Sequence, residues 1–418
     1  MKNKKAILSI CSVNYLNKAL VLFDSCRLNN ADCDFYLVLV DRKQEIDIVE
    51  KDLNVIWAQD LPIKNFLQHA FEYDVIEFNT NVKPTALKVL LQKYEAVIYL
   101  DPDIKVYDSL SGVFADLIHA SAVVTPHYNK PILDGNKPDD LELLKFGAFN
   151  LGFVGVSACE EGFQFLDWWS DRCLNHGFYE PQMGLGVDQK WVGLAPCFFP
   201  HMKILHDEGL NVAFWNLHER LLSKGDAGWM VNDNTPLKFI HFSSFSQKVP
   251  EAIAQKQTRF TPFSRPDFDV LAIEYARELE SKTNAIISNS VYGFDYFDDG
   301  AYITPALRRF YSCLKEANFS DVLNPFACVG PVKEFAKKNH LLVKGRPKSH
   351  RHIFKDLSAY SLQIKLITKL LHLIFIILGP ERYFNLMRYL AHISSLRNQG
   401  DMFNLANPRN DSAKNDKS

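Results

Sequence analysis

Residues 96–104 read Ala-Val-Ile-Tyr-Leu-Asp-Pro-Asp-Ile, and this stretch decides the fold. Its first five residues form a short apolar run, which is typical of a buried strand. Asp101 and Asp103 follow directly, and a turn at Pro102 just past the strand end lets both carboxylates converge on one point. Paired carboxylates suit a hard divalent cation whose other ligands are phosphate oxygens and water. The alternative is a plain polar loop, because Asp-Pro is common in turns.

Strand-type and helix-type segments alternate on both sides of this stretch. Residues 6–13 and 35–40 are apolar runs, and residues 16–28 between them have the apolar spacing of a helix. Such a βαβ opening predicts a parallel sheet with ligands at the carboxyl ends of its strands. Further expected elements are a helix at 84–93 and strands at 55–57, 122–125, 151–156 and 237–242.

Four segments are predicted along the chain. Residues 1–250 form one large α/β domain, because strands and helices alternate there without a repeat. Residues 251–345 turn mainly helical and form an accessory segment. Residues 346–399 form a basic amphipathic helical segment, and residues 400–418 form a polar, disordered tail.

The composition is that of a globular chain, with 47% hydrophobic and 23% charged residues among 418. The formal net charge of −2 excludes a nucleic-acid binder on electrostatic grounds. Eight cysteines form no CxxC pair, which favours a reducing cytoplasm. The N-terminal apolar run is too short for a signal peptide, and no clean apolar stretch of about 18 residues exists, so no spanning helix is expected.

Five motifs follow one another along the chain. They are Y-L-D-P-D-I at 99–104, T-P-H at 125–127, F-N-L-G-F at 149–153, D-Q-K-W at 188–191 and N-L-H-E-R at 216–220. With F-I-H-F at 239–242, the series resembles bacterial sugar transferases of the family-8 glycosyltransferase type, which have the GT-A fold. The resemblance spans about residues 6–245, and a weaker likeness through Tyr292-Gly-Phe-Asp reaches about residue 310. It implies a GT-A, Rossmann-like mixed sheet flanked by helices, with a mainly helical C-terminal extension.

The resemblance also implies an activity and a set of site residues. The implied activity is the metal-dependent transfer of a hexose from a nucleotide diphosphate sugar, a UDP-sugar, to a glycan or lipid-linked acceptor, with retention, in bacterial cell-surface polysaccharide synthesis. The implied ligands of Mn²⁺ or Mg²⁺ are Asp101, Asp103 and His241. The implied contacts to the nucleotide sugar are Asn14, Tyr15, Lys83, Asp101 and Asn150, and the residues implied near the anomeric carbon are Asp188 and Gln189.

One motif departs from the family pattern. Family members usually continue past the metal histidine as H-x-x-G-x-x-K, where the Gly and the Lys approach the diphosphate. This chain reads His241-Phe-Ser-Ser244-Phe-Ser-Gln-Lys248, so the Gly is a Ser and the Lys stands one place late. Whether Ser244 and Lys248 replace those contacts is left open by the sequence.

Each site residue also has an ordinary structural interpretation. His241 can be a strand-end histidine satisfied by backbone, Asn150 can cap a turn, and Asp188 can be the N-cap of a short helix with Gln189 on its surface. His127, after an expected strand, is interpreted as a loop residue rather than an acceptor contact.

Two other functional classes share parts of this sequence pattern. A phosphohydrolase of the haloacid-dehalogenase type also begins with D-x-D after a strand, but Lys105 stands where that family has Thr or Val. A non-catalytic sugar- or nucleotide-binding protein on a degenerate transferase fold is supported only by the Ser at 244.

Two apolar helices are expected near the C-terminus, at about 357–378 and 381–393, separated by Gly379-Pro380. The first carries the polar residues Ser361, Lys365, Thr368, Lys369 and His372 on one helical stripe, with Gln363 as the exception, and the wide apolar face has to be buried. Packing on the catalytic domain or on a partner subunit is one solution. The other is an anionic membrane surface contacted through 344–393, favoured by a net charge of +8 over 341–418 against −10 over 1–340. We therefore expect a cytoplasmic protein attached peripherally to the inner face of the cell membrane.

Overall fold

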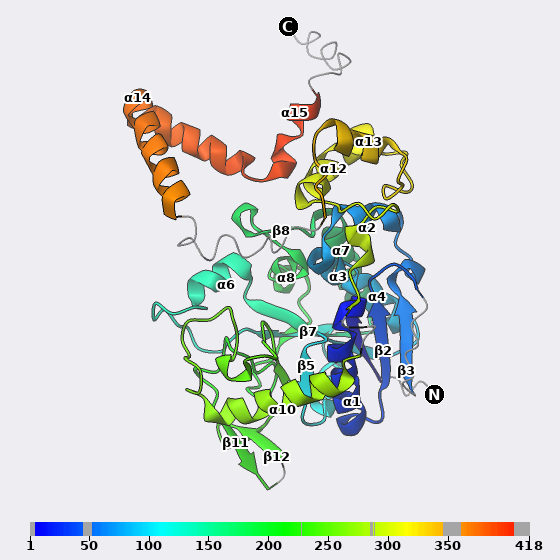
Figure 1. Cartoon of the computed structure of the whole chain (residues 1–418). Coiled ribbons are helices and arrows are strands. Elements are labelled where there is room, and N and C mark those ends of the chain that lie inside the picture. Colours follow the sequence, from blue (N-terminus) through cyan, green and yellow to red (C-terminus); the bar gives the residue numbers. More distant parts are fainter. Residues whose placement is uncertain are drawn as a thin grey trace. The chain divides into compact units, whose positions relative to one another are not determined.

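The computed structural model describes residues 5–44, 52–226, 228–284, 287, 289–345 and 361–404 (Figure 1). They fall into two compact units. The first comprises Met1–Phe66 and Val75–Phe294, and the second comprises Leu67–Asp74 and Asp295–Ser418. Residues 251–294, which the sequence assigned to the accessory segment, therefore lie in the first unit.

The first unit is built on a seven-stranded mixed sheet with the strand order β10-β6-β7-β4-β1-β2-β3. Its strands are β1 (Lys5–Cys11), β2 (Asp34–Leu39), β3 (Leu53–Trp57), β4 (Ala96–Leu100), β6 (Ala122–Pro126), β7 (Phe149–Ser157) and β10 (Met202–Ile204). Strand β7 is antiparallel to both of its neighbours, β4 and β6, and the other neighbouring strands of this sheet are parallel. The strands expected at 55–57, 122–125 and 151–156 are thereby confirmed.

Helices cover the sheet, so its central strands are buried on both faces, as in other α/β folds. The helices of the first unit include α1 (Leu16–Asn29), α3 (Val75–Asn81), α4 (Lys83–Leu91), α5 (Ser111–Asp116), α6 (Asp140–Phe146), α7 (Glu160–His176), α8 (Val187–Val192), α9 (Ala195–Phe198) and α10 (Pro266–Lys282). Every residue of β4 and β7 is buried. The expected α/β class, a mixed sheet flanked by helices, is confirmed.

Three smaller sheets lie around the large one. They are the pair β5 (Ile104–Val106) and β14 (Phe239–His241), the pair β8 (Tyr179–Glu180) and β9 (Leu185–Gly186), and the meander β11 (Leu222–Gly225), β12 (Gly228–Val231) and β13 (Thr235–Pro236). The β5–β14 pair is antiparallel and sets His241 opposite Ile104. This register brings the end of β14 beside the turn that follows β4.

The second unit is mainly helical. Its elements include α2 (Phe66–Glu72), α12 (Pro305–Asn318), α13 (Pro331–Lys338), α14 (Ser361–Ile393), η7 (Leu396–Gln399) and α15 (Asp401–Asn404). Arg308 is 2% exposed and donates to the carbonyl oxygens of Ala70, Phe71 and Tyr73. The ring of Phe71 also meets those of Phe297, Tyr311 and Phe326 at 4.8 to 5.7 Å. The segment Leu67–Asp74 is thus part of this unit's core, although it comes early in the chain.

Helix α14 is interrupted at Gly379, where φ is 71° and ψ is 171°, so the expected break at Gly379-Pro380 is confirmed. Within the described residues, Leu362–Ile393 is the one helix long and apolar enough by length and composition to cross a membrane, with a mean hydropathy of 1.8. The sequence contains no uninterrupted apolar run of that length here, but mean hydropathy tolerates the scattered polar residues of this segment. The expectation that no helix spans a membrane stays a prediction. Residues 346–360 and 405–418 of the predicted basic segment and tail lie outside the described residues.

Candidate metal centre

Asp101 and Asp103 lie in the tight turn between β4 and β5. The backbone N–H of Asp101 donates to the carbonyl of Gly152 at 2.8 Å, and the N–H of Ile104 donates to the carbonyl of Asp101 at 3.1 Å. The N–H of Phe242 donates to the carbonyl of Asp103 at 2.8 Å, which fixes the end of β14 against this turn. Strand β7, the turn and β14 therefore hold the three predicted ligands in place.

The ligand atoms of Asp101, Asp103 and His241 lie within 4.8 Å of one another. Nε2 of His241 is 3.0 Å from Oδ1 of Asp103 and 3.6 Å from Oδ2 of Asp101. Two carboxylates and one imidazole on a half-buried surface are a donor set that fits Mn²⁺ or Mg²⁺, with positions left for phosphate oxygens and water. The residues present therefore fit the expected cation.

The charges of the cluster are strongly coupled. Burial would lower the pKa of His241, but the Asp103 and Asp101 carboxylates outweigh it and raise that pKa above its ordinary value. Burial would raise the pKa of Asp103, but His241 and the Lys18 ammonium hold it well below its usual range. Without a cation, an imidazolium–carboxylate pair thus keeps the cluster together, and a bound cation takes the place of the proton.

Asn150 lies behind the imidazole of His241. Its Oδ1 accepts hydrogen bonds from the N–H of Gly152 and from Nδ2 of Asn211, both at 3.1 Å, and lies 3.2 Å from Nδ1 of His241. Because an amide oxygen only accepts, Nδ1 must carry its proton toward it. This arrangement leaves Nε2 directed at the carboxylates, as a ligand requires.

Replacing Asn150 by Ala should therefore weaken Mn²⁺ binding without removing a ligand. Loss of a residue that orients a ligand typically lowers metal affinity by about 10- to 100-fold. Electron paramagnetic resonance of free Mn²⁺ during a titration measures this affinity directly. The exposed Asn54 on β3 provides the control, and equal affinities for N150A and N54A would contradict the orienting role.

Gly152 leaves the space that His241 occupies. A Cβ at position 152 would lie 2.3 Å from Cε1 of His241 and 2.9 Å from Oδ1 of Asn150, far inside contact distance. The glycine of the F-N-L-G-F motif is therefore needed for close approach of the imidazole to β7, rather than for an unusual backbone conformation.

Trp215 packs between two histidines. Its ring meets those of His241 at 5.2 Å and His127 at 5.3 Å, both edge-to-face. His127 follows β6 in a loop, as expected, but it is only 9% exposed and its Nδ1 lies 3.0 Å from the carbonyl oxygen of Ala148. Burial lowers the pKa of His127 to about 4.

This pKa predicts a pH dependence of stability. In the unfolded chain, His127 is protonated below its ordinary pKa of about 6.5. In the folded chain, it becomes protonated only when the pH falls to about 4. The free energy of unfolding should therefore fall with decreasing pH across that window, by about 3 kcal/mol from this group alone. Urea unfolding should show a shallower pH dependence for H127Q than for the wild type. The exposed His119→Gln should keep the wild-type slope, and parallel slopes for all three proteins would refute the assignment.

Lys83 and Asp188 form a buried ion pair. Lys83 is 1% exposed, and its Nζ lies 2.5 Å from Oδ2 of Asp188, 2.7 Å from the carbonyl oxygen of Leu151 and 4.2 Å from the ring centroid of Tyr99. Burial raises the pKa of Asp188 above its ordinary value despite the opposing effect of Lys83. The N-cap of α8 is Gly186, so the alternative interpretation of Asp188 as a capping residue is wrong.

Gln189 is held at both ends of its amide. Its Oε1 accepts from the N–H of Leu151 at 3.2 Å, and its Nε2 donates to the carbonyl of Phe146 at 3.0 Å. The side chain is thus tied to backbone on both sides. The roles of Asp188 and Gln189 near an anomeric carbon stay predictions.

Asn14 and Tyr15 lie exposed in the turn after β1, in the short helix η1 (Val13–Tyr15). The hydroxyl of Ser12 donates to Oδ1 of Asn14 at 2.6 Å. The ammonium of Lys18 lies 4.4 Å from the ring centroid of Tyr15, and its charge also acts on Asp103 and His241. Lys18 is therefore a cationic residue of the site that the motifs did not indicate.

Tyr99 opens the Y-L-D-P-D-I motif, but the sequence assigned it no role at the site. Its hydroxyl donates to Oδ1 of Asp101 at 2.6 Å and fixes the orientation of that carboxylate. Ser244, which stands where the family pattern has Gly, adopts a φ of 59°, in the left-handed region that favours Gly. The turn after β14 thus keeps a backbone conformation suited to Gly while carrying a Ser. Lys248 is exposed, and its contact with a phosphate stays untested.

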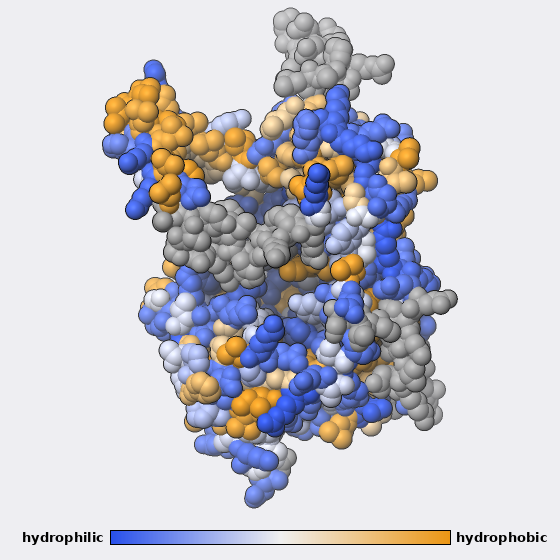
Figure 2. Space-filling model, in the orientation of Figure 1, coloured by the Kyte–Doolittle hydropathy of each residue, from blue (hydrophilic) through white to orange (hydrophobic). Residues whose placement is uncertain are grey.

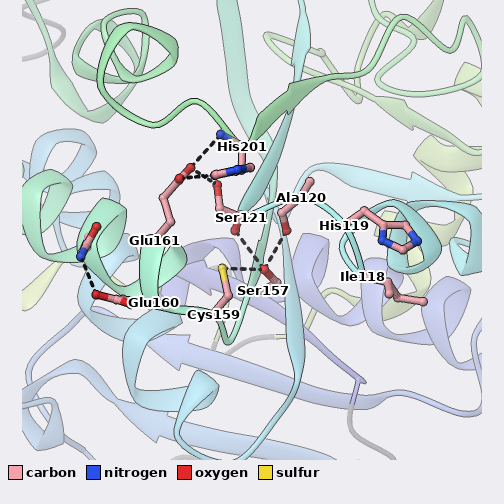
Figure 3. A pocket seen from close by; sticks show the side chains of 10 residues that line it. Ile118, His119, Ala120, Ser121, Ser157, Cys159, Glu160, Glu161 and His201 are labelled. Atoms are coloured by element: carbon pink, nitrogen blue, oxygen red, sulfur yellow. Dashed lines mark hydrogen bonds and ion pairs between the residues drawn. The ribbon is translucent and has the colours of Figure 1, made fainter.

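A separate pocket of about 470 Å³ lies away from these residues (Figure 3). Several of its polar side chains already have hydrogen-bond partners. Glu161 accepts from Ser121 and pairs with His201, and the hydroxyl of Ser157 donates to the carbonyl of Ala120. Because these groups are already partnered, the pocket does not provide an organised set of ligand donors.

The chain is similar in sequence to two curated bacterial proteins. No family model matches the chain. It is 26% identical to the uncharacterized protein YfnF of Bacillus subtilis over 252 residues, which are 57% of this chain and 81% of YfnF. It is 24% identical to YfnD of the same organism over 247 residues, which are 57% of this chain and 77% of YfnD.

The solved structures that it resembles are glycosyltransferases. The galactosyltransferase LgtC, in complex with donor and acceptor sugar analogues, is 15% identical with a TM-score of 0.42, over 67% of this chain and 97% of LgtC. GlyE of Streptococcus pneumoniae is 16% identical with a TM-score of 0.39, over 70% of this chain and 66% of GlyE. Values this low assign neither a family nor an activity.

Proposed function

We propose that the chain is a glycosyltransferase that moves a hexose from a nucleotide diphosphate sugar, UDP-linked, to a glycan or lipid-linked acceptor in bacterial cell-surface polysaccharide synthesis. The observation that carries the proposal is the Asp101–Asp103–His241 cluster at the end of β4. The order of sequence motifs around it supports the same function. The cluster lies where ligands bind in α/β sheets, beyond the carboxyl ends of parallel strands.

Each part of the site has a task in such a reaction. Asp101, Asp103 and His241 would hold Mn²⁺ or Mg²⁺, which neutralises the negative charge that develops on a leaving diphosphate. The Lys18 ammonium lies close enough to act on Asp103 electrostatically and adds positive charge on the same side. Asn14 and Tyr15, exposed in the turn after β1, are proposed to contact the nucleotide.

We propose retention of anomeric configuration by a same-face mechanism. Asp188 is neutralised by Lys83 at 2.5 Å, and Gln189 is bound to backbone through both amide atoms. Neither side chain is therefore prepared to attack as a strong nucleophile. The leaving diphosphate would instead accept the acceptor's proton, and the protein would contribute positioning and electrostatic stabilisation. Nuclear magnetic resonance of the product anomer tests this point, because an inverted product excludes it.

Hydrolysis of nucleotide sugars without acceptor tests the activity itself. A panel of donors incubated with Mn²⁺ should reveal slow hydrolysis of one of them, and EDTA should abolish it until Mn²⁺ is restored. Metal-independent binding without hydrolysis would instead indicate a non-catalytic sugar-binding protein. Release of phosphate from a generic aryl phosphate would indicate a phosphohydrolase.

A further inference from the structure

Helix α14 exposes an extensive apolar surface. None of the residues described from Leu362 to Ile393 is buried, and at least half of the surface of Ile367, Leu370 and Ile376 is exposed. The hydrophobic residues gathered over this helix are plain in Figure 2. Exposed apolar surface on this scale marks an interaction site.

The break at Gly379 divides the helix into two amphipathic arms (Figure 1). On the first arm the polar residues Lys365, Thr368, Lys369 and His372 share one stripe, and Gln363 is the exception. On the second arm Glu381, Asn385, Arg388 and His392 share a stripe, and Arg382 lies beside it. The rings of Phe375 and Tyr383 meet at 5.2 Å across the break and join the two arms.

The distribution of charge favours an interfacial helix over a spanning one. Lys369 and Glu381 bound the longest part of α14 without a charged side chain, residues 370–380, and this part itself contains His372 and the break. A transmembrane helix needs about 20 predominantly apolar residues, whereas a shorter apolar segment is typical of an interfacial helix. Helix α14 therefore fits a membrane surface rather than a membrane crossing.

We propose that α14 is an interfacial membrane anchor that lies in one leaflet of an anionic phospholipid bilayer. Its apolar faces would enter the boundary between headgroups and acyl chains, and its polar stripes would face the headgroups. Between Leu362 and Ile393 the chain carries four Lys or Arg residues against one Glu, so the charge complements anionic lipid. Tyr383 and Tyr389 have the amphipathic rings that are enriched at membrane interfaces.

A lipid surface fits α14 better than a protein partner does. Residues 373–378 read Leu-Ile-Phe-Ile-Ile-Leu and are apolar around the whole circumference of the helix. A docked protein would cover one side of this stretch, whereas acyl chains surround it. Helix α15, which follows α14 in the chain, packs on the rest of the second unit. The ring centroid of Phe403 lies 4.7 Å from that of Phe310 in α12 and 5.1 Å from that of Phe335 in α13.

Flotation of the full chain with vesicles measures the proposed binding. The chain should float with vesicles of phosphatidylethanolamine and phosphatidylglycerol, and more weakly with phosphatidylcholine alone or at high salt. The double variant I367D/L370D, which charges the apolar face, should reduce binding about tenfold or more. The matched control L323D/V329D adds the same charge at residues 79% and 82% exposed elsewhere in the second unit and should bind like the wild type. Binding unchanged by I367D/L370D would overturn the proposal.

The depth of α14 in the bilayer is tested with two single-tryptophan variants. The two tryptophans lie about 3 Å apart along the helix axis but on opposite faces of the helix. Phospholipids brominated on their acyl chains should quench the added tryptophan of Leu370→Trp strongly and that of Thr368→Trp weakly. Equal quenching at both positions would indicate a spanning helix and overturn the interfacial arrangement.

Two further results would also overturn it. The first is that the full chain binds none of the vesicles. The second is that the full chain is a dimer in solution and I367D/L370D converts it to a monomer, because α14 would then bind a second copy of the chain. Donor hydrolysis plays no part in these measurements, so the inference stands or fails separately from the proposed function.

Discussion

Replacing Asp103 by Asn should lower the rate of donor hydrolysis and of transfer by about 10²- to 10³-fold, the usual effect of removing one charge-stabilising group from a reaction centre. The substitution keeps the size of the side chain but removes the carboxylate that lies 3.0 Å from His241. It should also abolish tight Mn²⁺ binding, which paramagnetic resonance detects without any turnover. Both measurements therefore report on the same group by independent routes.

The control for D103N is Asp32→Asn. Asp32 pairs with Lys5 on the surface, with 58% of its side chain exposed, and lies outside the cluster. D32N should keep both the rate and the Mn²⁺ affinity, and the thermal unfolding of D103N should show that the fold survives. Activity that is insensitive to both D103N and EDTA would remove the basis of the metal site.

Replacing Lys83 by Met should have the largest effect on stability. It leaves the Asp188 carboxylate buried without its cation, and breaking a buried pair in this way typically costs about 3 to 5 kcal/mol. The free energy of unfolding in urea measures the loss. The double variant K83M/D188L, which removes both charges, should recover most of it, because two apolar side chains of similar size tolerate burial.

A surface pair supplies the matched comparison. Lys88 and Asp167 are ion-paired with 38% and 60% of their side chains exposed, so K88M should cost only about 0.2 to 1 kcal/mol. Equal losses for K83M and K88M, or no recovery in the double variant, would contradict the structural role of the buried pair. If K83M/D188L is stable but no longer hydrolyses donor, Lys83 or Asp188 also acts on the substrate.

The position of the candidate metal cluster was predictable in part from the sequence. Asp101 and Asp103 are neighbours in one motif at the end of an apolar strand, so their proximity follows from local structure. His241 is different, because only the antiparallel pairing of β14 with β5 brings it to Ile104 and the turn. No local pattern contains that pairing, and only the resemblance to a known motif series indicated it.

The contacts that surround the cluster were harder to predict. Lys83 and Asp188 are 105 residues apart, and nothing in either motif indicates that two opposite charges are buried together. Tyr99 gave a clearer signal, since residues two apart on a strand lie on one face and Asp101 follows it at that spacing. Lys18, one helical turn after Tyr15, could have been found in the same way.

The discontinuous second unit has a consequence for the order in which the chain is made. The segment Leu67–Asp74 leaves the ribosome about 220 residues before Asp295. At a synthesis rate of about 5 to 20 residues per second, roughly 10 to 45 s pass before the residues that pack against this segment are made. Until then the carbonyls of Ala70 and Phe71 lack the guanidinium of Arg308, and the ring of Phe71 lacks its aromatic neighbours.

During this interval the nascent chain displays the side chains of Ala70, Phe71 and Tyr73, which the folded second unit buries. Such a segment is a natural site for a chaperone to bind and for a stalled chain to aggregate. A chain released before residue 295 would carry this liability permanently. The core of the second unit can therefore form only after the residues beyond Phe294 have been synthesised.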